Sequence, residues 1–96
     1  MIRHATPEDW PRLIDMAKRF VAETSYRGLV EIAPEQVEES LRVITDDPNN
    51  AVLVSGSDGN VTGMIVVMVC PHPFSGERIA YEVVWWVDPE ARGDGV

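Results

Sequence analysis

Val83-Val84-Trp85-Trp86-Val87-Asp88-Pro89-Glu90-Ala91-Arg92-Gly93-Asp94-Gly95-Val96 is the stretch of sequence that indicates the fold. Its first half is a run of β-branched and aromatic residues, which predicts a buried strand, and Asp88-Pro89 predicts the end of that strand. Its second half predicts a glycine-rich loop from Arg92 onward. Such a loop lets backbone N–H groups turn toward an anion, and it commonly leads into the N-terminus of a helix that favours a phosphate.

This stretch resembles a motif of the GNAT superfamily of N-acetyltransferases, whose central strand ends in V-x-P and is followed by [RQ]-x-x-G-x-[GA]. Val87-Asp88-Pro89 matches the first part, and Arg92 to Val96 matches the second part up to its final Gly or Ala. The resemblance covers all 96 residues as the N-terminal part of a longer domain. It implies that a helix facing the phosphates, a strand, another helix and a last strand follow.

The remaining sequence predicts the element order β-α-α-β-β-β. The resemblance implies that these elements form an α/β (α+β) domain with a mixed, mostly antiparallel sheet flanked by helices. Thr6-Pro7 predicts a helix start, and Pro34 and Asp47-Pro48 bound a second helix. The strand at 61–70 has apolar residues on both faces, so we expect a sheet covered on both sides. The expected strands are 1–5, 51–55, 61–70 and 79–87, and the expected loop between the helices is 23–32.

The composition is that of one globular domain, here residues 1–96, with 45% apolar and 25% charged residues. The net charge of −8 disfavours nucleic acid and would attract a basic amine, although acidity also simply maintains solubility. The single cysteine, Cys70, excludes an internal disulfide and fits a reducing cytoplasm; its place in an apolar strand predicts inert packing. No run of residues predicts a membrane span or a secretion signal, so we expect no membrane partner.

The resemblance implies that acetyl-CoA binds at the end of the last strand and along the loop that follows. In the family, the backbone of this strand hydrogen-bonds the pantetheine arm and the loop takes the pyrophosphate. At the matching positions Trp86 and Val87 are the pantetheine contacts, and Arg92 supplies positive charge near the phosphates. The other interpretation of Arg92 is a solvated surface side chain. The loop amides at the matching positions belong to Gly93, Asp94, Gly95 and Val96.

Glu82 interrupts an otherwise apolar strand. A carboxylate buried there would need a partner, and burial would make it a better base. Family members often place a glutamate on this strand as the general base, usually acting through water, so the resemblance implies this catalytic role for Glu82. The alternative is a structural carboxylate that bonds a neighbouring element or lies on an uncovered face of the sheet.

The acceptor pocket is expected from the loop between the two helices, which forms part of it in the family. Tyr26, Arg27 and Glu31 lie in that loop, and Phe74 with His72 would line the opposite wall. A packing role for the tyrosine and solvent exposure of the histidine are the alternatives. The adjacent tryptophans, 85 and 86, are expected to pack on both faces of the sheet. The histidines have no carboxylate or cysteine at ligand spacing, so no metal site is expected.

The resemblance implies an N-acetyltransferase that moves acetyl from acetyl-CoA directly to an amine of a small molecule or peptide. The alternative is a noncatalytic CoA-binding or dimerising fragment of a GNAT-like fold. We expect residues 1–96 alone to be inactive, because the helix that closes the phosphate loop follows them in the family. A possible homodimer is expected, since an incomplete sheet exposes an edge that can pair with another chain.

Overall fold

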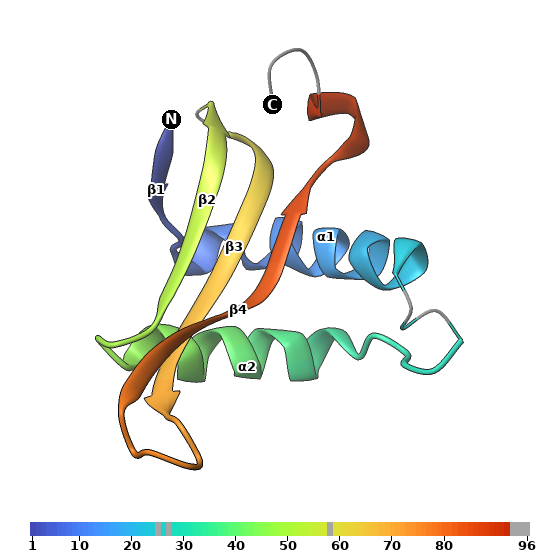
Figure 1. The fold of residues 1–96 in the computed structure, drawn as a ribbon. Coiled ribbons are helices and arrows are strands. Elements are labelled where there is room, and N and C mark those ends of the chain that lie inside the picture. Colours follow the sequence, from blue (N-terminus) through green and yellow to red (C-terminus); the bar gives the residue numbers. More distant parts are fainter. Residues whose placement is uncertain (25, 27, 58, 93–96) are drawn as a thin grey trace.

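Four strands form one antiparallel sheet in the order β1-β2-β3-β4 (Figure 1). The fold is taken from a computed structural model that describes residues 1–24, 26, 28–57 and 59–92. Neighbours in the chain are also neighbours in the sheet from β2 to β4, because each pair is joined by a hairpin. The strands are β1 (Ile2–His4), β2 (Ala51–Ser57), β3 (Asn60–Pro71) and β4 (Arg78–Val87).

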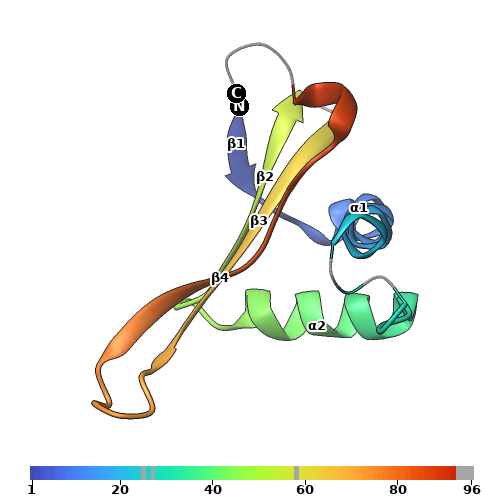
Figure 2. The ribbon, with the colours of Figure 1, turned by 45° about the vertical axis from the view of Figure 1, so that its right-hand side comes forward.

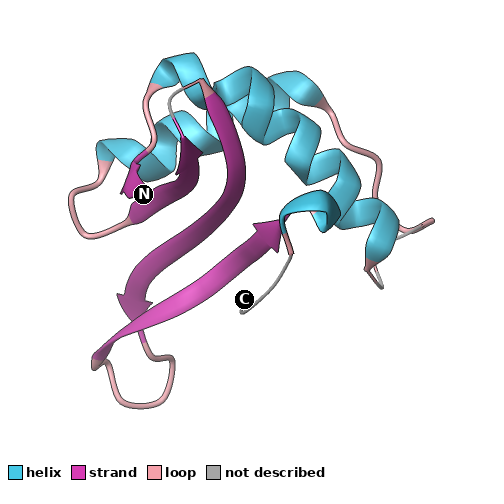
Figure 3. Ribbon diagram, turned by 90° about the horizontal axis from the view of Figure 1, so that it is seen from above, coloured by secondary structure: helices cyan, strands magenta, loops and turns pink. Residues whose placement is uncertain are grey.

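Two α-helices, α1 (Trp10–Glu23) and α2 (Pro34–Asp46), occur in the described part of the chain between β1 and β2. Both lie on the same face of the sheet (Figure 2). Short 3-10 helices precede α1 at η1 (Pro7–Asp9) and follow β4 at η2 (Pro89–Ala91). The view from above shows the helices as one layer and the strands as the other (Figure 3). This arrangement confirms the predicted α+β class and the order β-α-α-β-β-β.

The start of α1 differs from the prediction by one short turn. Thr6 is extended and its N–H donates to the Asp9 carboxylate at 2.8 Å, so the chain first forms the 3-10 turn of η1. Asp9 is buried, and its two oxygens accept hydrogen bonds from Arg3 at 2.8 and 2.9 Å. Asp9 thereby joins β1 to the start of α1.

The hydrophobic core lies between the helices and the inner face of the sheet. Leu13 and Met16 of α1 are almost fully buried against Val52 and Val54 of β2. Their spacing of three positions on α1 puts both side chains on one face of that helix. Leu41 of α2 completes the contact from the second helix.

Only one face of the sheet is covered by described elements, which corrects the expectation of cover on both faces. The strand β3 does lie inside the sheet, but its Ile65 is half-buried and pairs with Trp85. Trp85 is 65% exposed, whereas Trp86 is 4% exposed, so the two tryptophans do not both pack. Cys70 is exposed too, against the prediction of buried packing. The apolar run of β3 indicated burial without revealing that one layer of helices supplies it.

A β-bulge interrupts the pairing of β3 with β4 at Val83. Val66 pairs with Val84 and Val67 pairs with Glu82, so Val83 has no partner in the register. An extra residue shifts the alternation of side chains along a strand. The bulge therefore brings both Val83 and Val84 to the groove beneath β4, on the side of the helices.

Candidate functional site

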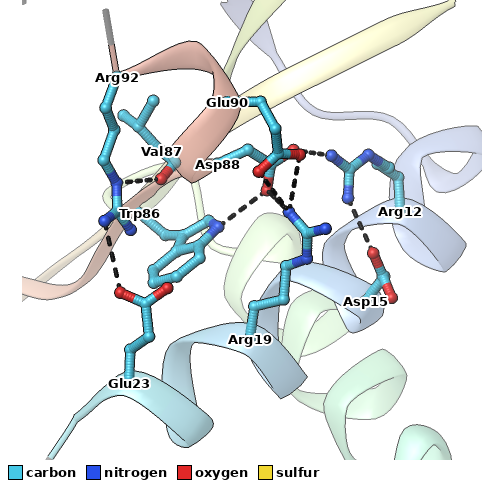
Figure 4. A network of polar contacts seen from close by, with 9 residues as sticks. All are labelled: Arg12, Asp15, Arg19, Glu23, Trp86, Val87, Asp88, Glu90 and Arg92. Carbon is cyan, nitrogen blue, oxygen red and sulfur yellow. Dashed lines mark hydrogen bonds and ion pairs between the residues drawn. The ribbon is translucent and has the colours of Figure 1, made fainter.

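A buried carboxylate, Asp88, organises the end of β4 where the candidate site begins (Figure 4). Its Oδ1 accepts a hydrogen bond from the indole Nε1 of Trp86 at 3.0 Å and lies 3.1 Å from Arg19. Its Oδ2 accepts a hydrogen bond from Arg12. Both arginines project from α1, so Asp88 ties the first helix to the last strand. A buried carboxylate is tolerated here because charged donors surround it.

Sequence reasoning missed this role, since Asp88 was interpreted only as the end of a strand. A signal was available in the spacing, because Trp86 and Asp88 are two positions apart and share a strand face. The neighbouring Glu90 accepts hydrogen bonds from Arg19 at 3.2 and 3.3 Å. Hydrogen bonds from its own backbone and from Arg19 lower the pKa of the Glu90 carboxyl, and Glu90 in turn raises the pKa of Arg19.

Arg92 is an exposed residue whose side chain lies against the ring of Trp86. Its guanidinium carbon is 4.5 Å from the centre of the Trp86 ring, a cation–π distance. Its Nε donates to the Val87 carbonyl at 2.7 Å, and its Nη1 lies 3.4 Å from a Glu23 oxygen (Figure 4). These contacts fix a positive charge at the end of β4, just before the glycine-rich sequence.

The N–H and C=O groups of Val87 point away from β3, toward the free edge of β4. Asp88 N–H donates to the Thr62 carbonyl at 2.8 Å, and Val87 is paired with Gly63. In an antiparallel ladder, alternate residues direct their N–H and C=O to the neighbouring strand, so Asp88 faces β3 and Val87 does not. By the same alternation Trp86 directs its backbone groups toward β3. The outward peptide groups of this strand end are thus those of Val87.

An apolar groove lies beneath β4, between α1, α2 and the segment 30–33. Its volume is about 340 Å³, and its walls are almost entirely aliphatic. A second hollow of about 280 Å³ adjoins it and shares Ala17, Val83 and Val84 with it. The lining of the apolar groove consists of Leu13, Ala17, Val30, Glu31, Ile32, Ala33, Gln36, Val37, Ser40, Leu41, Ile44, Met64, Val66, Val83 and Val84.

The predicted acceptor residues separate into two groups. Glu31 lines the apolar groove, and Tyr26 lines the adjoining hollow with its ring 6.1 Å from that of Phe20. Phe74 is 94% exposed and sits with His72 in the loop between β3 and β4, which extends away from the connection between the helices (Figures 1 and 2). Phe74 and His72 therefore do not form the expected second wall of the pocket.

Glu82 is exposed, so it is not the buried carboxylate that would make a better base, and its position agrees with the alternative of a carboxylate on an uncovered face of the sheet. It pairs with Val67 and, by the alternation along β3, shares the uncovered face of the sheet with Trp85. Its catalytic role stays a prediction, without the burial that motivated it. Arg27, Gly93, Asp94, Gly95 and Val96 lie outside the described residues.

No cluster of three or more His, Cys, Asp or Glu side chains in the described ranges could hold a metal ion. In the same part of the chain, neither helix combines the length and the apolar character that a bilayer span requires.

The fold of this chain is similar to the folds of known proteins. No protein-family model and no curated protein matches the sequence. Among solved structures, a ribosomal-protein-alanine N-acetyltransferase from Brucella melitensis is 28% identical, with a TM-score of 0.70 over 99% of this chain and 58% of its own. A predicted acetyltransferase with acetyl-CoA from Clostridium acetobutylicum is 14% identical, with a TM-score of 0.79 over 100% of this chain and 64% of its own. The chain has the GNAT acetyltransferase fold.

A third similar structure carries a different description. A transcriptional regulator from Bacillus halodurans is 23% identical, with a TM-score of 0.76 over 99% of this chain and 64% of its own. The chain therefore spans about three fifths of the length of these GNAT-fold chains. The predicted resemblance is confirmed at the level of the fold, across the chain's whole length.

Proposed function

We propose that this protein transfers acetyl from acetyl-CoA to an amine, and that the end of β4 binds the cosubstrate. The observation that carries the proposal is the outward backbone of Val87 beside the fixed charge of Arg92, on a fold shared with acetyltransferases. An extended amide chain can pair with outward peptide groups, and a guanidinium suits a phosphate. The residues at this strand end therefore fit a ligand that has both parts.

Acetyl-CoA supplies a thioester, whose carbonyl carbon bonds to the amine nitrogen as the bond to sulfur breaks and CoA leaves as the thiol. The protein's part is to hold the amine in reach and to accept its proton. Glu82 is the proposed base because it is the carboxylate adjoining the bulge in β4. Its side chain lies on the face of the sheet opposite the groove, so the proton would have to reach it through water around the free edge of β4. The groove beneath Val83 and Val84 is proposed to hold the acceptor.

Acetyl-CoA would displace two of the contacts that Arg92 makes in this structure. Arg92 Nε bonds the Val87 carbonyl, and Glu23 lies against the same guanidinium. A pantetheine amide that pairs with Val87 would take the place of Arg92 at that carbonyl. A pyrophosphate would compete with Glu23 for Arg92, and its two charges make it the stronger partner. The exchange would leave Arg92 facing the phosphates.

Replacing Gly95 with valine in the complete protein tests the cosubstrate site. A β-branched side chain would occupy space that the pyrophosphate needs, so acetyl-CoA should bind about tenfold more weakly or worse, equivalent to about 1.4 kcal/mol, by calorimetry. Asp94→Ala is the matched control, because it keeps the backbone N–H at the neighbouring position. Unchanged affinity in a folded Gly95→Val protein would rule out this binding mode.

Release of free thiol in the presence of amines separates the enzyme from the noncatalytic alternative. A transferase should release CoA only when acetyl-CoA and an accepted amine are both present. Tight binding of acetyl-CoA without thiol release, across amines that differ in size and charge, would instead favour a CoA-binding module.

A further inference from the structure

We propose that the apolar groove selects acceptors that have one primary amine and an aliphatic or aromatic body. This inference rests on the proposed acetyl transfer and names the substrate class for that site. It commits the groove to a small-molecule amine, in preference to a polyamine, an amino sugar or a protein surface.

The walls of the groove favour an apolar body. Leu13, Val37 and Leu41 form its helix side, and Val66 and Val84 form its sheet side. Its volume of about 340 Å³ lies at the lower end of the range for small-molecule pockets, which suits a hexyl chain or a phenyl ring. Burying such a body removes apolar surface from water, and each methylene contributes to affinity.

The polar groups of the groove indicate a single cationic end. Glu31 is the only charged residue in the described lining, and no described cation forms an ion pair with it. Gln36 and Ser40 also line the groove, and the Gln36 amide donates to the Ser40 hydroxyl at 3.3 Å, but neither side chain carries a charge that would pair with an ammonium. Glu31 is exposed, so it supplies one solvated carboxylate at the rim of the groove with which the ammonium of an acceptor could pair. The net charge of −8 adds a general attraction.

The same arrangement excludes acceptors with many polar groups. A polyamine or an amino sugar would carry several ammonium or hydroxyl groups into aliphatic walls that offer few partners. Each polar group buried without a hydrogen bond carries a penalty that an apolar body does not. The aliphatic walls of the groove would thus select among amine acceptors, and Glu31 would position the amine nitrogen.

The location of the groove suits the transfer. Val83 and Val84 line it because of the bulge, and they lie on the strand that ends at Val87. An amine held at Glu31 with its body in the groove would therefore approach β4 from the helix side. The acceptor and the cosubstrate would then meet at the same strand.

The test uses the complete protein and a series of amines from propylamine to hexylamine. Calorimetry without acetyl-CoA should show that each added methylene tightens binding by about threefold. Hexylamine and 4-phenylbutylamine should bind at least about tenfold more tightly than ethanolamine or spermidine. In the thiol-release assay, kcat/KM should follow the same order.

Two pairs of variants test separately how the groove binds the apolar body of the amine and how it binds the nitrogen. Ala17→Leu fills the groove from α1 and should weaken hexylamine more than propylamine, whereas Ala22→Leu, on an exposed part of the same helix, should change neither. Glu31→Gln should weaken every amine but leave hexanol unaffected. Glu35→Gln, a nearby exposed carboxylate outside the groove, is its control. Circular dichroism checks that each variant folds.

The outcomes distinguish this inference from the proposed function. Affinity that is independent of chain length, or an Ala17→Leu protein that folds and binds hexylamine normally, would overturn the inference. Faster thiol release with spermidine than with hexylamine would overturn it while supporting acetyl transfer. Binding that depends on chain length without thiol release would support the groove and contradict the transferase. Failure of every amine to bind would assign the groove to apolar side chains of another segment.

Discussion

Asp88 forms ion pairs with two arginines of α1 and accepts a hydrogen bond from the indole N–H of Trp86, so one side chain sets the position of the strand end. Its carboxylate is 4% exposed, whereas Arg12 and Arg19 are 33% and 42% exposed. The arginines can recover solvent when their partner is lost. The Asp88 carboxylate is buried and cannot be rehydrated in the same way. The free-energy cost of breaking these contacts therefore falls mainly on Asp88.

Asp88→Asn should lower the free energy of unfolding by about 2 kcal/mol, since it removes the charge that two arginines and an indole share. Urea denaturation followed by tryptophan fluorescence measures the change. Glu90→Gln removes an exposed carboxylate from the same cluster and should leave the midpoint unchanged. Equal effects of the two substitutions would mean that the buried contact adds nothing beyond surface charge.

Asp9 makes stability depend on acidity. The hydrogen bonds from Arg3, followed by the backbone N–H of Thr6, lower the pKa of Asp9 below its ordinary value of 3.8, against the opposing effect of burial. A lowered folded-state pKa stabilises the fold above the unfolded-state pKa. That contribution falls as the pH drops below 3.8 and is lost once the pH has passed through the lower folded-state value.

Urea unfolding between about pH 5 and about pH 2 should therefore show an acid-side loss of stability that Asp9→Asn reduces. The exposed Asp46 at the end of α2 provides the control, because Asp46→Asn should retain the full loss. If Asp9→Asn left the acid-side slope as steep as in the unmodified protein, the Arg3 contact would not govern it.

At the scale of elements, local signals predicted the helices and strands well. Pro34 and Asp47-Pro48 bounded the second helix, and α2 spans Pro34–Asp46. Proline and capping signals act within one turn of the chain, so a single sequence reveals them. The bulge at Val83 could not be predicted, because the apolar run 83–87 has no alternation that would set its phase.

The candidate site was only partly predictable for the same reason. Val87 and Arg92 were found from a contiguous pattern, whereas the burial of Asp88 depends on Arg12, which is 76 positions away. The exposure of Glu82 could be named only as an alternative, because the absence of helices over one face of a sheet leaves no mark on the strand's own composition. Contacts across the chain are therefore the part that sequence patterns do not reveal.

The hairpin between β2 and β3 depends on Gly56, which combines a φ of 134° with a tight contact. A Cβ there would lie 2.2 Å from the Asn60 carbonyl, so Gly56→Ala should lower the free energy of unfolding by about 2 kcal/mol. Gly59→Ala is the matched control: its φ is 72°, and a Cβ there meets nothing within 4 Å. Thermal unfolding compares the two, and equal losses would show that only backbone conformation matters.

For the whole molecule, the consequence of one covered face is an apolar surface on the other. Trp85 is 65% exposed there and Ile2 is 71% exposed. No described strand pairs with the outer edge of β4, since β4 is last in the sheet. A second copy of the chain could pair with that edge and cover Trp85, which is our proposal for the possible homodimer.

Light scattering on residues 1–96 should therefore detect association that depends on concentration, and the same sample should show no acetyl transfer. Trp85→Lys should reduce the association, because a charge would replace the apolar contact. Phe74→Lys removes an even more exposed aromatic side chain from a loop and should not change it. A monomer at all concentrations, or an active one, would contradict this account of the chain.

The tie between α1 and the end of β4 also has a kinetic consequence. Arg12 and Asp88 are 76 positions apart, so their contact closes a long loop, and loop closure of this kind slows folding. During synthesis α1 leaves the ribosome first, so Arg12 cannot pair with Asp88 until the end of β4 has been made. The arrival of β4 would then be the event that completes the core and aligns Trp86, which makes tryptophan burial a late signal in refolding.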